Sequence, residues 1–417
     1  MKRALVFSGG GAKGSYQIGV WKALRKLHIK IDIVTGCSIG SINAALFAEN
    51  KYHIAKKMWL KITTDDLFTK DETKVFKTLG LKFDKAKEYL DRLIDEPKIR
   101  KSKIDYGLVT FNYKKRTPKI LTKQEIPEGK LVDYILASST FYPFIEKKKI
   151  DDDYYIDGGF YDNMPINLAV DMGATEVIAI DLKNIGIKRK TKNKEIPVTV
   201  IEYNLNDYGT LIFTKEKAKE RIKLGYNDTM KKFNKLDGNT YTFKYNSLSK
   251  NYNKIKEYYI DLLKVIFLSN DSKLIKEIFK ITKYNTLFAN IKQNKDISNY
   301  ILDSIEYLGK TFDIDKTKIY NIDNFNRLLI KKVKELNYLK VGTKLKGKML
   351  IGYIYNKYME SENKENVYRE LFNLALVFSK DFLSAVYLIS ISKKYKLTFQ
   401  AEDVYNNIYK FLNNNEN

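Results

Sequence analysis

Residues 31–48 of the chain spell IDIVTGCSIGSINAALFA. A short β-branched run at residues 31–34 comes first, and residues 39–48, which are small or apolar, have helical character. Between the two lies Gly36-Cys37-Ser38-Ile39-Gly40, a G-x-S-x-G pattern. A strand, a tight turn that carries a serine and a following helix form a nucleophile elbow, whose sharp turn leaves no room for bulky neighbours. We therefore predict that Ser38 lies at the N-terminus of a helix, where the helix dipole favours a developing negative charge.

Strand and helix signals alternate along the chain on both sides of this unit. Strands are predicted at residues 4–7, 31–34, 106–111, 119–121, 154–156, 176–181 and 196–203. Helices are predicted at residues 16–27, 39–48, 131–137, 166–172 and 215–233. Because apolar strands alternate with helices, the pattern predicts an α/β fold, with a mostly parallel sheet and helices on both faces. Residues 55–100 interrupt the pattern with helical sequence that could form a cap over a site.

The composition changes after about residue 236, where the chain becomes rich in Lys, Asn and Tyr with helical spacing. We predict two domains, an α/β domain at residues 1–235 and an α-helical C-terminal region at residues 236–417. With 44% hydrophobic residues the chain can bury a sizeable core. The one cysteine excludes a disulfide within the chain and a cysteine-built zinc site, and no metal or cofactor is expected.

The formal net charge of +25 would attract an anionic partner. A coding bias toward Lys, Asn, Ile and Tyr accounts for much of this charge. Whatever its origin, the charge would still attract an anionic membrane surface, which is the expected partner, whereas nucleic acid is not expected. The N-terminal apolar run is too short for a signal peptide. The most apolar window, residues 371–391, contains Lys380 and Asp381, so we predict a buried helix there instead of a membrane span. The expected location is the cytoplasm with peripheral contact to membranes, and export without a cleaved signal stays open.

A glycine-rich segment, Ser8-Gly9-Gly10-Gly11-Ala12-Lys13-Gly14, follows the first predicted strand. Consecutive glycines let backbone N–H groups point into a site, which suits an oxyanion or a phosphate. Gly9, Gly11 and Gly14 also satisfy the dinucleotide pattern G-x-G-x-x-G, but the acidic residue that should end the second strand is missing, since Asp32 begins that strand. A nucleotide-binding domain is therefore kept as an alternative.

A second conspicuous turn, Asp157-Gly158-Gly159, follows the short strand at residues 154–156. An Asp-Gly pair is common in surface turns, but an aspartate held at a strand end can also point into a cleft. The two histidines, His28 and His53, are poorly placed to serve Ser38, because the α/β-hydrolase order is serine, acid, histidine and no histidine follows residue 53. Asp157 is the remaining candidate for the base, provided that partial desolvation makes its carboxylate basic enough.

These motifs, in this order, resemble the patatin-like phospholipase family over about residues 3–233. The resemblance includes Ala137-Ser138-Ser139, Pro143, residues 157–165 and Gly173-Ala174. It implies that Ser38 is the nucleophile and Asp157 the base. It further implies an elbow shaped by Gly36 and Gly40, and an oxyanion hole from the glycine-rich loop. That loop comprises Gly9, Gly10, Gly11, Lys13 and Gly14, and the N–H groups of Gly10 and Gly11 are its expected donors.

The resemblance implies a serine lipid acyl hydrolase of phospholipase A or lysophospholipase type that forms an acyl-enzyme. Its expected partner is a phospholipid or another lipid ester. Alternatives stay open: a transacylase that uses the same pair, a catalytically silent membrane-associated scaffold, or an ordinary turn capped by Ser38, with Cys37 as a packed neighbour. The head group, the acyl position, the oligomeric state and the role of residues 236–417 are left open by the sequence.

Overall fold

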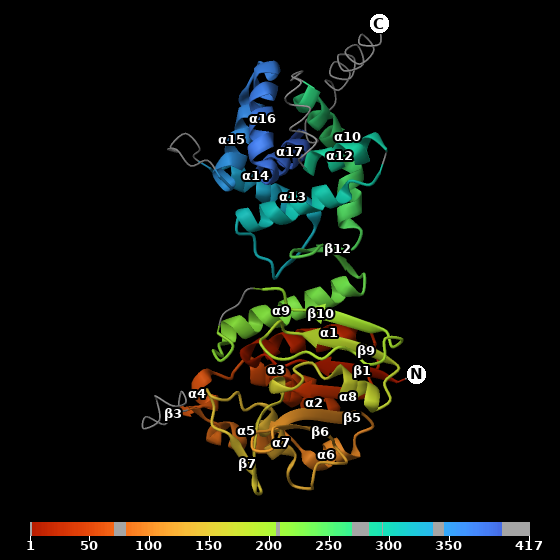
Figure 1. The fold of residues 1–417 in the computed structure, drawn as a ribbon. Helices are drawn as coiled ribbons and strands as arrows, with labels where there is room; N and C mark the ends of the chain where they lie inside the picture. Colours follow the sequence, from red (N-terminus) through yellow and green to blue (C-terminus); the bar gives the residue numbers. More distant parts are fainter. Residues whose placement is uncertain are drawn as a thin grey trace. The chain divides into compact units, whose positions relative to one another are not determined.

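The structure is a computed structural model that describes residues 2–70, 81–205, 209–268, 283–293, 295–336 and 346–393. The chain divides into two compact units, Met1–Phe233 and Asn234–Asn417. Figure 1 draws the first from red to yellow-green and the second from green to blue. Each unit has its own hydrophobic core.

An eight-stranded sheet in the order β10-β9-β1-β2-β5-β8-β7, with β6 beside β5, forms the centre of the first unit. Its strands are β1 (Arg3–Phe7), β2 (Ile33–Cys37), β5 (Asp105–Asn112), β6 (Thr117–Thr122), β7 (Lys148–Ile150), β8 (Asp153–Asp157), β9 (Glu176–Asp181) and β10 (Val198–Glu202). From β10 to β5 all neighbours are parallel, whereas β6, β7 and β8 pair antiparallel. The predicted strands are confirmed. β6 runs antiparallel because only a short turn joins it to β5, too short for a crossover.

Helices cover both faces of this sheet, as predicted. They are α1 (Ser15–Lys26), α2 (Ile39–Ala48), α7 (Leu131–Ser138), α8 (Ile166–Asp171) and α9 (Lys215–Lys232). Side chains of β1 alternate between two cores: Leu5 and Phe7 belong to the large cluster with α1 and α2, while Ala4 and Val6 pack with α8. The α/β fold class is therefore confirmed.

Two glycines let α1 and α9 cross in close contact. A Cβ added to Gly19 would lie 2.0 Å from the carbonyl oxygen of Ile222, and one added to Gly225 would lie 2.1 Å from that of Tyr16. We expect Gly225→Ala to destabilise the protein by about 1–3 kcal/mol, because the two backbones must separate. In an unpacked helix the same change would stabilise by about 1 kcal/mol.

Urea unfolding would measure this change, with Lys219→Ala on the exposed side of α9 as the control. The control should stay within about 0.5 kcal/mol of the wild type. A more stable Gly225→Ala protein would contradict the close crossing.

The predicted cap is largely helical. It comprises α3 (Tyr52–Trp59), α4 (Thr64–Leu67), α5 (Asp84–Leu93) and α6 (Glu96–Lys101), with a small antiparallel pair, β3 (Thr69–Lys70) and β4 (Leu81–Lys82). Residues 71–80 lie outside the described part of the chain. Leu67, Phe83 and Tyr89 from these elements pack against the core of the first unit.

The second unit is mainly helical, as predicted. Its helices are α10 (Ser247–Leu268), α12 (Lys283–Lys292), α13 (Ser298–Thr311), α14 (Ile322–Lys334), α15 (Lys348–Glu360), α16 (Lys364–Val377) and α17 (Ser379–Lys393). It also contains a small sheet that the sequence analysis missed, β11 (Leu236–Asp237), β12 (Thr242–Lys244) and β13 (Ile319–Tyr320). The single buried helix expected at residues 371–391 is wrong in one respect: Phe378 leaves the helical conformation and separates α16 from α17. Among the described residues, no helix is both long and apolar enough to span a membrane.

Candidate active site

Ser38 lies in a tight turn between β2 and α2, with φ 55° and ψ −133°. The two glycines of the motif are required by close backbone contacts. A Cβ on Gly36 would lie 2.4 Å from the carbonyl oxygen of Gly40, and one on Gly40 would lie 2.2 Å from that of Phe7. A non-glycine residue at positive φ costs about 1–3 kcal/mol, and such strain is concentrated at functional sites. The turn therefore has the shape of a nucleophile elbow.

The end of α7 holds both Ser38 and Asp157. The Ser38 N–H donates to the Ser138 hydroxyl at 2.9 Å, and that hydroxyl donates to the Val109 carbonyl at 2.7 Å. The carbonyl of Thr140 accepts the Asp157 N–H at 2.8 Å. Residues 137–139 belong to the family resemblance, but nothing in the sequence indicates that Ser138 positions the elbow.

Asp157 is the last residue of β8 and is 4% exposed. Its Oδ1 accepts the Gly159 N–H at 2.8 Å and the Cys37 thiol at 3.7 Å, and Ser38 lines the same cavity as this carboxylate. Burial raises the pKa of Asp157 to about 6, although the nearby Ser38 side chain, the Gly159 N–H and the Cys37 thiol oppose the shift. At neutral pH the carboxylate is mainly ionised, yet it is more basic than an ordinary aspartate, which suits a proton acceptor.

Sheet register brings the serine and the aspartate together. Cys37 pairs with Val109 on β5, and the next residue of β5, Thr110, pairs with Asp157. A Cβ on Gly158 would lie 2.1 Å from the Val109 carbonyl oxygen, so the glycine after Asp157 allows the chain to turn away. Burial, followed by the nearby Asp157 and Asp162 carboxylates, raises the pKa of Cys37 well above its usual range. The thiol therefore stays protonated and is a poor nucleophile.

The glycine-rich loop faces the same site. Gly9 donates its N–H to the Asn163 carbonyl at 3.0 Å, and Lys13 donates its N–H to the Gly10 carbonyl at 3.2 Å. Gly10 and Gly11 line the cavity, and within the described residues no acceptor is found for their N–H groups. Of the five loop residues predicted for an oxyanion hole, these two therefore have both the position and the available donors.

The other loop residues have packing roles. The Lys13 side chain is buried, with its ammonium 6.0 Å from the centre of the Tyr203 ring. A Cβ on Gly14 would lie 2.8 Å from side-chain atoms of both Ile39 and Trp59. Neither residue lines the cavity.

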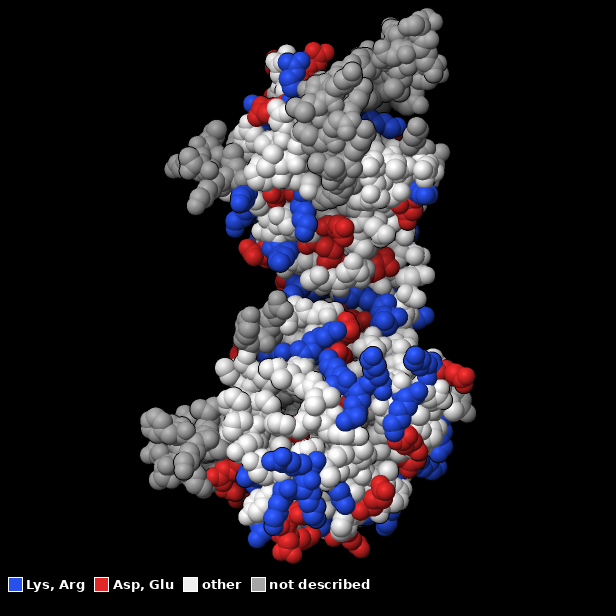
Figure 2. Space-filling view, viewed as in Figure 1, with Lys and Arg blue, Asp and Glu red and all other residues white. Residues whose placement is uncertain are grey.

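Ser38 and Asp157 open onto a cavity of about 360 Å³. The walls are almost entirely apolar on the side of the cap. They include Met58, Trp59, Ile62, Leu67, Phe68, Phe83, Ala86 and Leu90. An apolar cavity with a few polar groups at one end suits a ligand with a long hydrocarbon chain and one reactive polar group. Figure 2 shows a hollow within an uncharged area of the first unit.

Both histidines are exposed and absent from the cavity lining. His28 follows α1, and His53 lies on α3. Among the described residues, no group of three His, Cys, Asp or Glu side chains is arranged to hold a metal ion.

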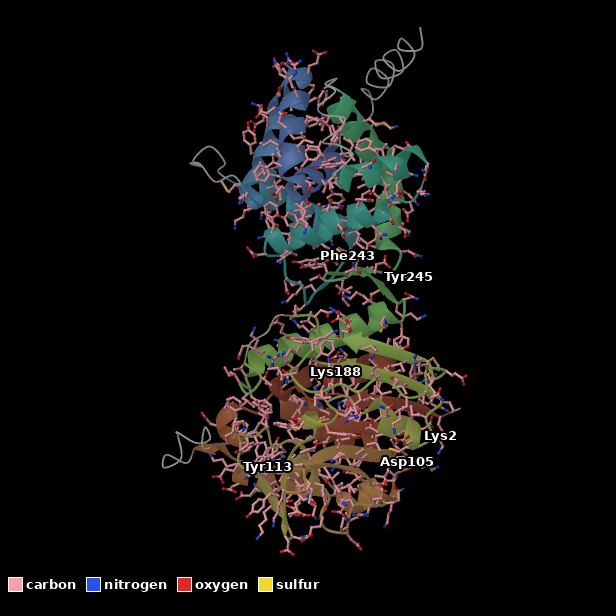
Figure 3. The ribbon with its side chains drawn as sticks, in the orientation of Figure 1. Lys2, Asp105, Tyr113, Lys188, Phe243 and Tyr245 are labelled. Atoms are coloured by element: carbon pink, nitrogen blue, oxygen red, sulfur yellow. The ribbon has the colours of Figure 1, made fainter. Side chains whose placement is uncertain are left out.

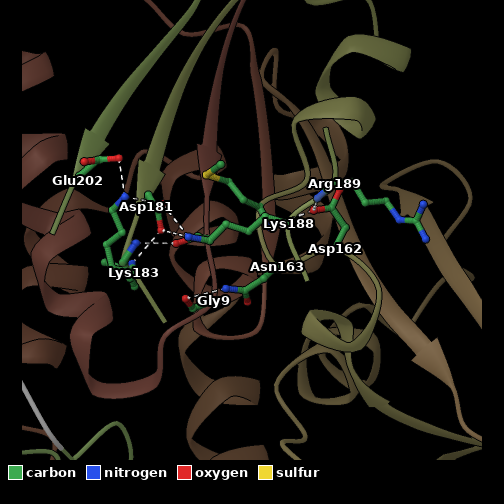
Figure 4. A network of polar contacts seen from close by, with 11 residues as sticks. Gly9, Asp162, Asn163, Asp181, Lys183, Lys188, Arg189 and Glu202 are labelled. Carbon is green, nitrogen blue, oxygen red and sulfur yellow. Dashed lines mark hydrogen bonds and ion pairs between the residues drawn. The ribbon is translucent and has the colours of Figure 1, made fainter. Parts of the chain in front are cut away.

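Residues 184–187 form one rim of the cavity, a role that no motif indicated. Figure 4 shows how this segment is held. The Lys188 ammonium contacts both Asp181 carboxylate oxygens at 2.7 Å, and Lys183 contacts Glu202. Asn163 lines the cavity and donates through Nδ2 to the Gly9 carbonyl at 3.4 Å.

The fold and the site define an α/β protein of the nucleophile-elbow class. Residues 5–170 match the family model described as Patatin-like phospholipase. That result confirms the resemblance found in the sequence.

Two of the relatives have patatin-like phospholipase in their names, and a third is named a lysophospholipase. The chain is 32% identical over 191 residues to patatin-like phospholipase domain-containing protein 7 of Rattus norvegicus and 33% identical over 192 residues to domain-containing protein 6 of Homo sapiens. It is 30% identical over 188 residues to lysophospholipase nte1 of Aspergillus terreus. Each match covers 43% of this chain but only 12–13% of the relative. A crystal structure of VipD from Legionella pneumophila aligns over 96% of this chain and 92% of that chain, at 14% identity and a TM-score of 0.35, which is too low to carry a conclusion.

Proposed function

We propose that the chain is a serine lipid acyl hydrolase of phospholipase A or lysophospholipase type, with residues 1–235 as its catalytic domain. Support comes chiefly from one observation: the elbow serine, Ser38, lies beside the buried carboxylate of Asp157 at the polar end of an apolar cavity. The patatin-like phospholipase domain and the lysophospholipase among its relatives support a lipid ester as the substrate class. Residues 236–417 have no assigned role.

In the first half of the reaction, the Asp157 carboxylate takes the proton of the Ser38 hydroxyl while Oγ attacks the acyl carbonyl carbon. The N–H groups of Gly10 and Gly11 stabilise the resulting oxyanion. The tetrahedral intermediate expels the alcohol portion of the lipid, which takes the proton from Asp157. An acyl ester on Ser38 remains.

In the second half, water enters beside the acyl ester and gives its proton to Asp157 as its oxygen attacks the carbonyl. The ester bond to Ser38 then breaks, Ser38 Oγ regains the proton from Asp157, and the fatty acid leaves. A lysolipid or glycerol in place of water would receive the acyl group and make the protein a transacylase. The enzyme works at the surface of anionic membranes, where its substrates are found.

The experiment is fatty-acid release by the full chain from vesicles of mixed phospholipids, from lysophospholipid and from a soluble p-nitrophenyl ester. Mass spectrometry identifies the products, and Ser38→Ala is the blank. We expect release by the wild type only. An acyl group found on added glycerol would indicate transacylation instead. No turnover of any substrate, together with no labelling by a fluorophosphonate, would overturn the proposal and favour a catalytically silent scaffold.

A further inference from the structure

Large apolar side chains surround the mouth of the Ser38 cavity and point into solvent. Ile185 is 83% exposed, Ile187 53% and Phe160 41%, and all three line the cavity. Removing large apolar side chains from water is favourable, so leaving three of them exposed at one rim is unfavourable without a partner. Single exposed apolar residues are ordinary, whereas a cluster at a cavity mouth indicates a binding surface.

A fourth side chain joins this cluster from another segment. Ile212 is 60% exposed, and its neighbours Thr210, Leu211 and Phe213 line the cavity. The Thr210 hydroxyl donates to the Asn184 side-chain oxygen at 3.2 Å, which ties the segment of Ile212 to that of Ile185. We call Phe160, Ile185, Ile187 and Ile212 the apolar rim.

The apolar rim is held in place from behind. The Ile187 N–H donates to the Gly159 carbonyl at 2.9 Å, and the Ile187 carbonyl accepts the Asn163 N–H at 2.6 Å. Lys188 is anchored on Asp181, as Figure 4 shows. The isoleucines are thus displayed on a backbone bonded to the turn that carries Asp157, and they cannot fold inward without breaking these bonds.

Positive charge continues directly from the apolar rim. Between residues 182 and 194 the chain has six basic residues and no acidic one. Lys183 and Lys188 are paired with carboxylates, but Lys190, Lys192 and Lys194 are exposed, and the described residues provide them with no ion pair. Figure 2 shows Lys and Arg gathered beside the uncharged area of the first unit, and Figure 3, in the same orientation, labels Lys188 there. Each such lysine is attracted to the negative surface of an anionic bilayer.

We propose that the apolar rim and Lys190, Lys192 and Lys194 form the surface on which this protein docks to an anionic phospholipid bilayer. The rim side chains enter the headgroup region, the lysines contact acidic headgroups, and the cavity mouth faces the lipid that supplies the acyl ester. This inference rests on the proposed lipid hydrolase function and names the partner of that site. An apolar centre flanked by unpaired lysines is the chemistry that recognises such a bilayer.

The test is co-sedimentation of the full chain with vesicles of phosphatidylcholine alone and of phosphatidylcholine with phosphatidylserine. All variants carry Ser38→Ala so that the lipids stay intact. We expect Ile185→Ser with Ile187→Ser to weaken binding to both vesicles about tenfold or more. We expect Lys190→Glu with Lys192→Glu to abolish the preference for phosphatidylserine, an effect of about tenfold that high salt should reproduce in the parent.

Matched controls are Ile54→Ser, an exposed isoleucine on α3 outside the cavity lining, and Lys244→Glu with Lys250→Glu, exposed lysines of the second unit. Thermal melting confirms that each variant folds. Rim variants that bind vesicles as tightly as the parent, or a parent that binds neither vesicle, would overturn the docking surface. Because no turnover is needed, vesicle binding through the rim without any ester cleavage would refute only the hydrolase proposal. Ester cleavage with rim-independent binding would refute only the docking surface.

Discussion

Replacing Ser38 with alanine is expected to lower kcat by roughly 10⁴–10⁶-fold on any ester that the wild type cleaves, as loss of a serine nucleophile does elsewhere. The hydroxyl supplies the attacking oxygen, and no neighbouring group can take over that step. Cys37 is buried, and its pKa is raised well above the usual range, so it stays a thiol. The fold should survive, because the Ser38 N–H and its bond to Ser138 are retained. Fatty-acid release and far-ultraviolet circular dichroism measure the two effects.

A fluorophosphonate probe provides the control for this prediction. Peptide mapping of the labelled wild type should place the adduct on Ser38, and Cys37→Ala should still take up the probe. Residual activity in Ser38→Ala within tenfold of the wild type, or an adduct elsewhere, would mean that Ser38 is not the nucleophile.

Replacing Asp157 with asparagine is expected to lower kcat by roughly 10³–10⁴-fold and to stabilise the protein at neutral pH. The folded-state pKa of Asp157, about 6, lies above the ordinary aspartate value of 3.8. The folded protein therefore binds this proton more tightly than the unfolded chain. The contribution of this tighter proton binding to the free energy of unfolding is fully present below pH 3.8 and is lost as pH rises through 6. An asparagine avoids the burial of a negative charge, and the resulting gain in the free energy of unfolding at neutral pH is at most about 3 kcal/mol.

Urea unfolding at pH 7.5 and at acidic pH tests the sign. The stability advantage of Asp157→Asn should be present at pH 7.5 and should vanish toward pH 4. In the wild type, kcat/KM on a soluble ester should rise with pH through an apparent pKa near 6, because the ionised carboxylate is the base.

Asp162 is the control for that titration. It is also buried, which raises its pKa to about 6, but it lies outside the cavity lining and accepts the Met164 N–H at 3.2 Å. Asp162→Asn should leave the rise of kcat/KM near pH 6 in place. If that rise disappears in Asp162→Asn, or if Asp157→Asn keeps wild-type activity, the proton acceptor has been assigned to the wrong carboxylate.

The strands and helices of the first unit can largely be predicted from short stretches of sequence. Every strand predicted in the first 203 residues is present, because runs of β-branched and apolar residues between glycines have few other stable conformations. The elbow follows in part from steric limits within five residues, since a Cβ on Gly36 would meet Gly40, but Gly40 itself is required by its close approach to Phe7 of β1. The antiparallel direction of β8, the small sheet at β11–β13 and the break at Phe378 were missed, because each depends on pairing or packing between distant segments.

The sequence by itself determined which residues could react: a serine in an elbow, an aspartate in a glycine-bounded turn, and no histidine in a position to serve them. Only the tertiary structure decided that Ser38 and Asp157 lie close together, because their proximity depends on β5 lying between β2 and β8 in one register. It also decided that the Gly9 N–H is bonded to Asn163 from far along the chain, whereas the N–H groups of Gly10 and Gly11 find no acceptor among the described residues. The raised pKa of Asp157 likewise has no local cause, because it comes from burial among segments that only the folded chain brings together.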